Sequence, residues 1–425
     1  MEEKKLFHKD FVLVVIGQII SLFGNGILRF ALPLYILDQS GSPALFGMVS
    51  ALSFVPMVLI SPIGGVLADR VNKQRIMVIL DFLTAGILLV FTFASKNLSI
   101  VPLIIIVMML LYSIQGLYSP AVQASMPLLH NEDRLVTANA IVNLVQSLAG
   151  LLGPIIGGFL YANFGLWPIV YIATGCFAAS AVLELFIRIP FYYRKNSQGV
   201  IGTIVTDLRE SNDFVFKAYP VMKRVIYITF FINLFMSTMI IIGLPVIITQ
   251  HLHLSSELYG ISQGVIGCGG LVGGVLAGSI ARKIKVEDSW KMLIPCALSI
   301  FPIALVLIVG TSSIFSYIVI TAMSMLVMVC STIFSIIMLA FAQQVTPPHL
   351  VGKVISVVMA INLLAQPLGQ SLFGVAFERF AHAPGLVVLA AALLSLFVAL
   401  YSKSCFAELR KPSMLASQKA FDTAL

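Results

Sequence analysis

The sequence predicts an all-α membrane protein with twelve transmembrane helices in two six-helix bundles and both termini in the cytoplasm. Its composition, its long apolar segments and the placement of its basic residues all indicate this class. Of the 425 residues, 59% are hydrophobic and only 10% are charged, and the mean hydropathy is +1.02. Soluble domains carry about 25% charged residues. Since so few charges cannot cover a water-facing surface, we expect lipid to surround the chain.

Twelve apolar segments are long enough to be transmembrane helices, because about 20 helical residues cross the hydrocarbon core. No cleavable signal precedes the first of them, since its apolar run is too long for one. An even number of spans places both termini on the same side. We expect the spans at 11–37, 43–68, 76–95, 99–125, 135–162, 165–188, 225–250, 257–281, 291–310, 314–343, 352–378 and 384–402.

Basic residues determine which side this is. All but three of the 26 lysines and arginines lie in the N-terminal segment, the even-numbered loops or the C-terminal tail. The exceptions are Lys96 and Arg379 in odd-numbered loops and Arg29 inside the first span. Because basic residues concentrate in cytoplasmic loops, both termini are predicted to be cytoplasmic. The net charge of +8 is therefore a topology signal, and no nucleic-acid partner is expected.

The longest interruption between spans divides the chain into two halves. We expect an N-terminal bundle at 1–188, a cytoplasmic linker at 189–224, a C-terminal bundle at 225–403 and a cytoplasmic tail at 404–425. Residues 201–219 of the linker could form a helix on the membrane surface. Ser42-Pro-Ala-Leu-Phe-Gly47 recurs as Ser255-Ser-Glu-Leu-Tyr-Gly260, and Gly153 and Gly158 match Gly369 and Gly374. Such internal repeats are typical of secondary transporters.

The loop between the second and third spans reads Gly64-Gly-Val-Leu-Ala-Asp-Arg-Val-Asn-Lys-Gln-Arg75. Gly65 would let two helices approach closely, and Asp69 could accept hydrogen bonds at a neighbouring helix N-terminus. An ordinary basic loop on the cytoplasmic side is the other interpretation. The loop resembles the signature loop of the major facilitator superfamily, which implies the major facilitator fold and a conformational latch. That latch would comprise Gly65, Asp69, Arg70, Lys73 and Arg75.

The fifth span carries Gly150-Leu-Leu-Gly-Pro-Ile-Ile-Gly-Gly158. Small residues allow close helix contact, and Pro154 would kink the helix. The segment resembles an element of the family's antiporters, with Gly153, Pro154, Gly157 and Gly158 as its characteristic residues. A packing face with no meaning for transport direction is the alternative.

The chain as a whole resembles the branch of the superfamily that holds macrolide efflux proteins and the enterobactin exporter. The most specific stretches are Gly17-Gln-Ile-Ile-Ser21, Ser119-Pro-Ala-Val-Gln123 and Ala365-Gln-Pro-Leu-Gly369. The resemblance implies proton-driven export of amphipathic molecules across a bacterial plasma membrane. Many members carry an arginine in the fourth span that is tied to proton coupling, whereas this chain has Tyr112 there.

Four polar residues lie on one face of the first span, because their spacing of three, four and four residues matches the helical period. They are Gln18, Ser21, Asn25 and Arg29. Polar groups at membrane depth are costly, so this face should line the bundle interior or a cavity. Arg29 either binds an anionic substrate or tunes a proton-carrying acid, or it pairs with a carbonyl or acid and reaches outward.

Acidic residues are scarce within the spans. Asp81 is a possible proton site, or else a structural partner of the nearby basic loop. Glu184 and Glu378 lie near span ends and are expected to be solvated. No deep acid is expected to face the polar side of the first span.

Uncharged polar residues beside many Phe and Met residues suit a broad pocket for amphipathic ligands. Hydrogen bonding between helices is the competing explanation. Together with the four residues of the first span, the predicted substrate cavity comprises Gln115, Tyr118, Asn143, Gln146, Asn233, Asn362 and Gln366.

These patterns favour a secondary exporter of small amphipathic compounds, drug-like or siderophore-like, that works by alternating access. A lipid or lysolipid flippase, or a non-transporting sensor on the same fold, is the alternative. Neither a catalytic constellation nor a Walker loop is present, so an enzyme or primary pump is not expected. The five cysteines have no metal-ligand spacing, and no metal or cofactor is expected. The expected partners are a small-molecule substrate, a proton and membrane lipids, and the chain is expected to be a monomer.

Overall fold

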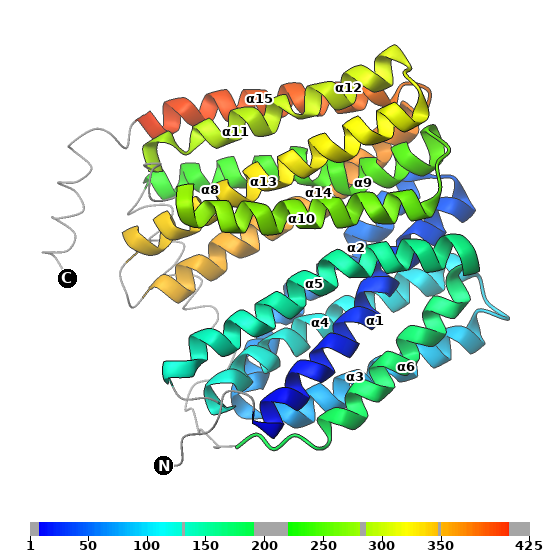
Figure 1. Cartoon of the computed structure of the whole chain (residues 1–425), viewed down its shortest axis with the longest axis vertical. Helices are drawn as coiled ribbons and strands as arrows, with labels where there is room; N and C mark the ends of the chain where they lie inside the picture. Colours follow the sequence, from blue (N-terminus) through cyan, green and yellow to red (C-terminus); the bar gives the residue numbers. More distant parts are fainter. Residues whose placement is uncertain (1–7, 130–131, 191–219, 281–285, 347–349, 408–425) are drawn as a thin grey trace, which may run out of the picture. The chain divides into compact units, whose positions relative to one another are not determined.

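The computed structural model describes residues 8–129, 132–190, 220–280, 286–346 and 350–407, and no strand occurs in these ranges. Twelve helical segments within them are long and apolar enough to cross a membrane, which confirms the predicted number (Figure 1). The expected surface helix at 201–219 and most of the expected tail lie outside the described residues.

The first six spans are six continuous helices. They are α1 (Lys9–Ser40), α2 (Pro43–Arg70), α3 (Lys73–Ala94), α4 (Ile100–Leu129), α5 (Glu132–Phe164) and α6 (Leu166–Glu184).

Two of the later spans are interrupted. The seventh combines α8 (Pro220–Ile232), a π-helical turn (Asn233–Ser237), α9 (Thr238–Pro245) and a second π-helical turn (Val246–His251). The ninth is divided into α11 (Trp290–Leu298) and α12 (Ile300–Val309). The remaining elements are α10 (Ser256–Ile280), a 3₁₀ turn (Val286–Asp288), α13 (Ser313–Val345), α14 (Val351–Arg379) and α15 (Pro384–Ala407).

Short connections between the helices are fixed by local capping. Gly41 ends α1 in the left-handed conformation, with φ of 62°, which glycine adopts without strain. The Ser42 hydroxyl then accepts a bond from the Leu45 amide and starts α2. At the other end of α2, the Asn72 side chain accepts a bond of 3.0 Å from the Gln74 amide and starts α3. Two helices can therefore follow each other with a loop of only two residues.

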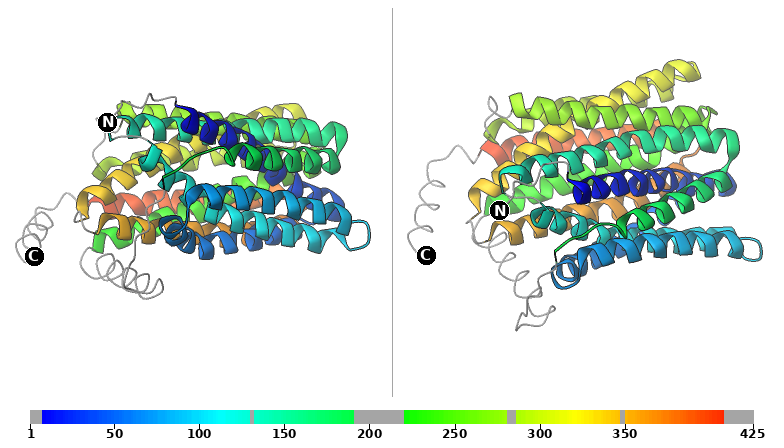
Figure 2. Two further views of the ribbon diagram at one scale, coloured as in Figure 1. Left: turned by 90° about the horizontal axis from the view of Figure 1, so that it is seen from below. Right: turned by 60° about the horizontal axis from the view of Figure 1, so that its bottom comes forward.

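The described residues form two compact units. The first unit contains α1 to α6 together with Leu244–Gly267 and Gln370–Glu378. In it α1 packs against α5 and α6, α2 against α4, and α3 against α4 and α6; both views of Figure 2 show α3 and α4 side by side. The second unit contains the described parts of 205–243, 268–369 and 379–425, where α15 packs against α11 and α12.

Glycines of the sequence repeat meet crosswise inside the first unit. A Cβ added to Gly47 would lie 2.9 Å from the Gly374 Cα atom, and one added to Gly158 would lie 2.9 Å from the Gly260 Cα atom. Gly47 and Gly260 come from the two copies of one motif, and Gly158 and Gly374 from the two copies of the other. We call these contacts the two glycine seams. Only glycine allows backbones to approach this closely.

Candidate functional site

The polar face of α1 forms a ladder of contacts with α4. Arg29 places its guanidinium carbon 3.9 Å from the centre of the Tyr112 ring. One turn earlier, Asn25 Nδ2 donates a bond of 2.8 Å to Gln115 Oε1. Two turns before Asn25, Gln18 Nε2 donates a bond of 2.8 Å to Tyr118 Oη.

Numbers fall along α1 as they rise along α4, so the two helices run antiparallel along this ladder. The predicted polar residues therefore do share one face of α1, and Gln18 and Asn25 on that face are hydrogen-bonded to α4. Among the described residues, Arg29 has no acid or carbonyl partner, and its guanidinium lies over the Tyr112 ring.

Two acids also lie beside this polar face, which corrects the expectation that no deep acid faces it. Ser21 Oγ donates a bond of 3.3 Å to Asp81 Oδ1 on α3. Tyr118 Oη donates a bond of 2.6 Å to Glu184 Oε1 on α6. The expected solvation of Glu184 is wrong, since its side chain is completely buried. For Asp81, the structure describes a serine hydroxyl as its partner and no contact with the basic loop.

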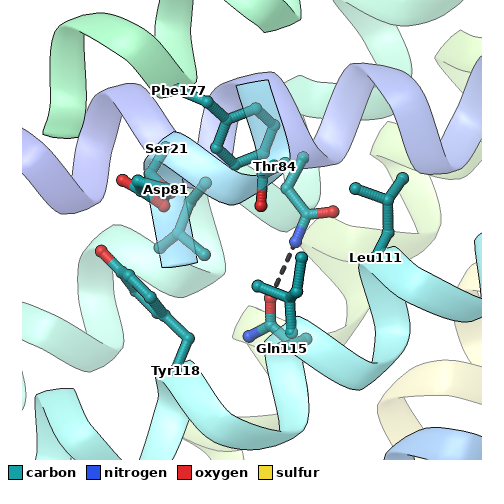
Figure 3. A pocket seen from close by; sticks show the side chains of 10 residues that line it. Ser21, Asp81, Thr84, Leu111, Gln115, Tyr118 and Phe177 are labelled. Atoms are coloured by element: carbon teal, nitrogen blue, oxygen red, sulfur yellow. Dashed lines mark hydrogen bonds between the residues drawn. The ribbon is translucent and has the colours of Figure 1, made fainter. Parts of the chain in front are cut away.

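A small cavity of about 20 Å³ lies next to this cluster. Figure 3 shows Asp81, Ser21 and Tyr118 on one side of it and Gln115, which accepts the bond from Asn25, on another. The Tyr118 hydroxyl points toward Asp81 and Ser21 (Figure 3). A space of this size holds one water molecule, and its polar lining could bind one. The cavity is too small for an organic substrate.

Small residues bring the α6 carboxylate to α1. A Cβ added to Gly17 would lie 3.4 Å from both Glu184 Cγ and Ser180 Oγ. Ser180 Oγ donates a bond of 3.0 Å to the Gly17 carbonyl. Seven residues later, a Cβ on Gly24 would lie 3.0 Å from Cys176 Cβ. A side chain larger than alanine at Gly17 would press against Glu184, which accepts the bond from Tyr118.

The second unit contains a larger cavity, of about 350 Å³. It brings together three residues of the predicted substrate cavity: Asn233 in the first π-helical turn, and Asn362 and Gln366 on α14. The other lining residues are uncharged and mostly apolar: Met222, Val225, Thr229, Ser335, Met338, Leu339, Ala342, Ile355, Val358, Met359 and Leu363.

The predicted cavity residues therefore fall into separate groups. Ser21, Asn25, Gln115 and Tyr118 line the small cavity, Gln18 and Arg29 belong to the α1–α4 ladder, and three others line the large cavity. Asn143 on α5 is exposed and Gln146 is half-buried, and neither lines a described cavity. The helical period predicted that Asn143 and Gln146 share a polar face, but it could not predict what that face contacts.

The predicted latch is only partly described. Asp69 lies in α2, and its side chain falls outside the described residues. Arg70 and Arg75 are exposed, whereas Lys73 is 9% exposed. No close approach is described at Gly65, where a Cβ would meet none of the described atoms within 4 Å. A close approach occurs one residue earlier, where a Cβ on Gly64 would overlap the Gly116 carbonyl oxygen of α4.

The glycines of the fifth span form a packing surface. A Cβ on Gly153 would lie 3.0 Å from the Gly26 Cα atom, and one on Gly157 would lie 3.2 Å from the Phe30 ring. Gly158 makes the seam with Gly260. Pro154 lies within the unbroken helix α5. These contacts agree with the packing interpretation of the motif, while its link to antiport remains a hypothesis.

A family model described as Major Facilitator Superfamily matches residues 14–370. The chain belongs to the Major Facilitator Superfamily. Among its relatives, macrolide efflux protein A of Streptococcus pyogenes is 23% identical over 89% of this chain and 92% of that protein. The enterobactin exporter EntS of Salmonella typhimurium is 23% identical over 86% of this chain and 85% of its own length.

The crystal structure of the nucleoside transporter NupG shares the fold of this superfamily member, with a TM-score of 0.73, 15% identity and coverage of 94% of this chain and 99% of that one. The chain is therefore a multi-pass membrane transporter and not an enzyme, and its bacterial relatives indicate the plasma membrane. The names of the two relatives describe efflux and export, respectively.

Proposed function

We propose that this transporter exports small amphipathic molecules by alternating access, in exchange for protons, and that the 350 Å³ cavity of the second unit binds the substrate. The cavity supports this proposal because it combines a mostly apolar lining with a few amide groups, as sites for drug-sized ligands do. The efflux proteins among its relatives support the direction of transport.

The cavity favours uncharged ligands that carry hydrogen-bond donors. None of the lining residues that the structure describes is charged, so a charged ligand would lose its hydration without an ion pair from them in return. Asn362 Nδ2 already donates a bond of 3.0 Å to the Val358 carbonyl, and Asn362 Oδ1 is buried without a partner. Asn233 Nδ2 is likewise bonded to the Thr229 carbonyl at 3.0 Å. Asn233 Oδ1 already accepts a bond of 3.3 Å from Ser237. Asn362 Oδ1 is therefore the acceptor that a hydroxyl group of a ligand would satisfy.

Three structural expectations belong to the same proposal. The bundles are those at 1–188 and 225–403, both termini lie in the cytoplasm, and the chain works as a monomer. Asp81 takes part in proton coupling, because it is a buried acid beside a water-sized cavity.

Asn362→Leu tests the substrate site. Leucine keeps the bulk of the side chain and removes the acceptor, so ligands with a hydroxyl group should lose one neutral hydrogen bond. That bond is worth about 0.5–1.5 kcal/mol, and we expect the half-saturating concentration in proteoliposomes to rise roughly 2–10-fold. Matched ligands without the hydroxyl should be unaffected.

Asn163→Leu is the matched control. Asn163 also donates to the carbonyl four residues earlier, at 2.8 Å, but it is exposed at the end of α5. Asn163→Leu should leave the half-saturating concentrations of both ligand types unchanged. Equal effects of Asn362→Leu on both ligand types would show that this cavity does not bind the substrate.

A further inference from the structure

Asp81 and Glu184 are two carboxylates buried in the same small region of the first unit. Their side chains are 2% and 0% exposed. Each has one oxygen in a hydrogen bond, from Ser21 and from Tyr118 respectively, and one oxygen that is buried without a partner. They are close enough to interact electrostatically. Two such unpartnered oxygens need an explanation, because buried polar atoms are usually bonded.

No cation balances the two carboxylates among the described residues. The groups around them on α1, α4 and α6 are neutral polar side chains, namely those of Gln18, Ser21, Tyr118 and Ser180. The charged groups described at this end of α1, of α3 and after α6 include Lys9, Asp10, Lys73, Arg75 and Arg188, and no ion pair of theirs with either acid is described.

Asp10 is already engaged, because it accepts a bond of 2.9 Å from the Arg188 amide. Two adjacent buried carboxylates without a cation cannot both be ionised at acceptable cost. In the state that the structure shows, at least one of the two acids therefore carries a proton.

The hydroxyl groups nearby cannot replace this proton. Ser180 Oγ lies 3.0 Å from the Gly17 carbonyl, to which it donates, and it also lies beside Asp81. Tyr118 gives its hydrogen to Glu184 and receives a bond from Gln18. The unpartnered Asp81 and Glu184 oxygens are left as the positions where a carboxyl hydrogen can sit.

We propose that Asp81 and Glu184 form one carboxylate pair that binds and releases the coupling proton, with Tyr118 holding Glu184 in place. The inference rests on the proposed proton-coupled export and adds Glu184 to it. On release, a carboxyl O–H bond breaks, its electron pair stays on the carboxylate oxygen, and a water molecule takes the proton. The 20 Å³ cavity beside Asp81 has room for that water. The Asn25–Gln115 bond forms part of the boundary of this cavity and would control further access of water.

The pair and the substrate cavity have no residue in common. The substrate therefore does not displace the proton by binding to the same carboxylate. Coupling must act through the conformational equilibrium that both ligands influence. Variants of the pair should then reduce the accumulation of substrate that a pH gradient drives, while substrate binding stays intact.

Asp81→Asn, Glu184→Gln and the double variant test this, in proteoliposomes with a pH gradient and with a substrate of the wild-type protein. Each single variant should lose gradient-driven accumulation by about 5–150-fold, the usual size of coupling between two sites. Substrate counterflow, which needs no net proton movement, should persist and would show that the variants are folded. Because the two acids act as one site, the double variant should lose no more than the more affected single one. Glu257→Gln, a half-buried acid at the start of α10, is the control.

Infrared difference spectra of the purified protein provide a readout without substrate. Acidification should produce a carboxylic acid band in the wild type, and the double variant, which lacks both acids, should lose it. Accumulation retained in Glu184→Gln, additive losses in the double variant, or accumulation driven by a sodium gradient would overturn the proposal. If the wild type shows the band but moves no amphipathic compound, proton-coupled export fails while the carboxylate pair stands.

Discussion

Gly47→Ala perturbs one glycine seam by a single methyl group. In the structure, an added Cβ would overlap the Gln370 backbone oxygen and lie 2.9 Å from the Gly374 Cα atom. Both are backbone atoms, so no side-chain rotation can relieve the overlap. The start of α2 and the end of α14 would have to separate. Their other link is the Glu378 carboxylate, which accepts bonds from the Ser42 hydroxyl and the Ala44 amide.

The size of the effect follows from this overlap. Overpacking by one methyl group typically costs about 1–3 kcal/mol. If the seam exists in one transport state and opens in another, the same free energy shifts their ratio by about 5–150-fold toward the open state. The change also removes a glycine from a helix interior, which stabilises the helix by up to about 1 kcal/mol in either state. A control for that second effect is therefore needed.

Thiol labelling measures the opening. Gln370 is 5% exposed beside the seam, so a cysteine there should react only when the seam opens. The five native cysteines would first be replaced. We expect Gly47→Ala to increase the labelling rate of Gln370→Cys by about 5–150-fold, because the rate follows the open population. Gly274→Ala on α10 is the control, since a Cβ there meets nothing within 4 Å.

Labelling that stays unchanged in a folded Gly47→Ala protein would refute this reasoning. It would show that the seam yields locally without separating the two helices. Gly260→Ala should act in the same direction, because its Cβ would lie 2.5 Å from the Pro154 carbonyl oxygen.

Three further predictions concern other parts of the chain. Arg29→Lys should retain most transport, because a lysine can also lie on the Tyr112 ring, whereas Arg29→Gln should lose it; equal activity of the two variants would remove the cation from the mechanism. Tyr118→Phe removes the bond to Glu184, so the pH dependence of transport should shift while counterflow persists; an unchanged pH profile would show that Tyr118 does not influence the pair. Cysteines at the exposed positions Arg75 and Lys96 should be labelled only from the cytoplasm and only from outside, respectively; the opposite pattern would reverse the topology.

The sequence was sufficient to predict the twelve spans, because span length and apolarity depend on the bilayer and not on tertiary contacts. It also predicted that Gln18, Ser21, Asn25 and Arg29 share a face, because that follows from the helical period. Their partners could not be predicted in the same way. The register between α1 and α4 is determined by packing, and only the structure pairs Asn25 with Gln115 and Arg29 with Tyr112.

Glu184 shows why the candidate site was harder to predict than the fold. Its position near the end of an apolar segment predicted solvation, but Gly17 lets α6 pack closely on α1 and buries it. One signal was present in the sequence, since Gly17 and Gly24 lie seven residues apart on one face of the first span. The substrate cavity was only partly predicted, because amides that bond within a bundle and amides that line a cavity have the same periodicity.

The separation of the two candidate sites leads to a last prediction. Asn362 belongs to the second unit and Glu184 to the first, and they have no described partner in common. Effects of changes at independent sites add, whereas residues of one network do not. In counterflow, where the proton gradient plays no part, Asn362→Leu should raise the half-saturating concentration by the same factor in the wild type and in Glu184→Gln. A different factor in the two backgrounds would mean that Glu184 contributes to substrate binding directly, and the proton and the substrate would then compete for one site.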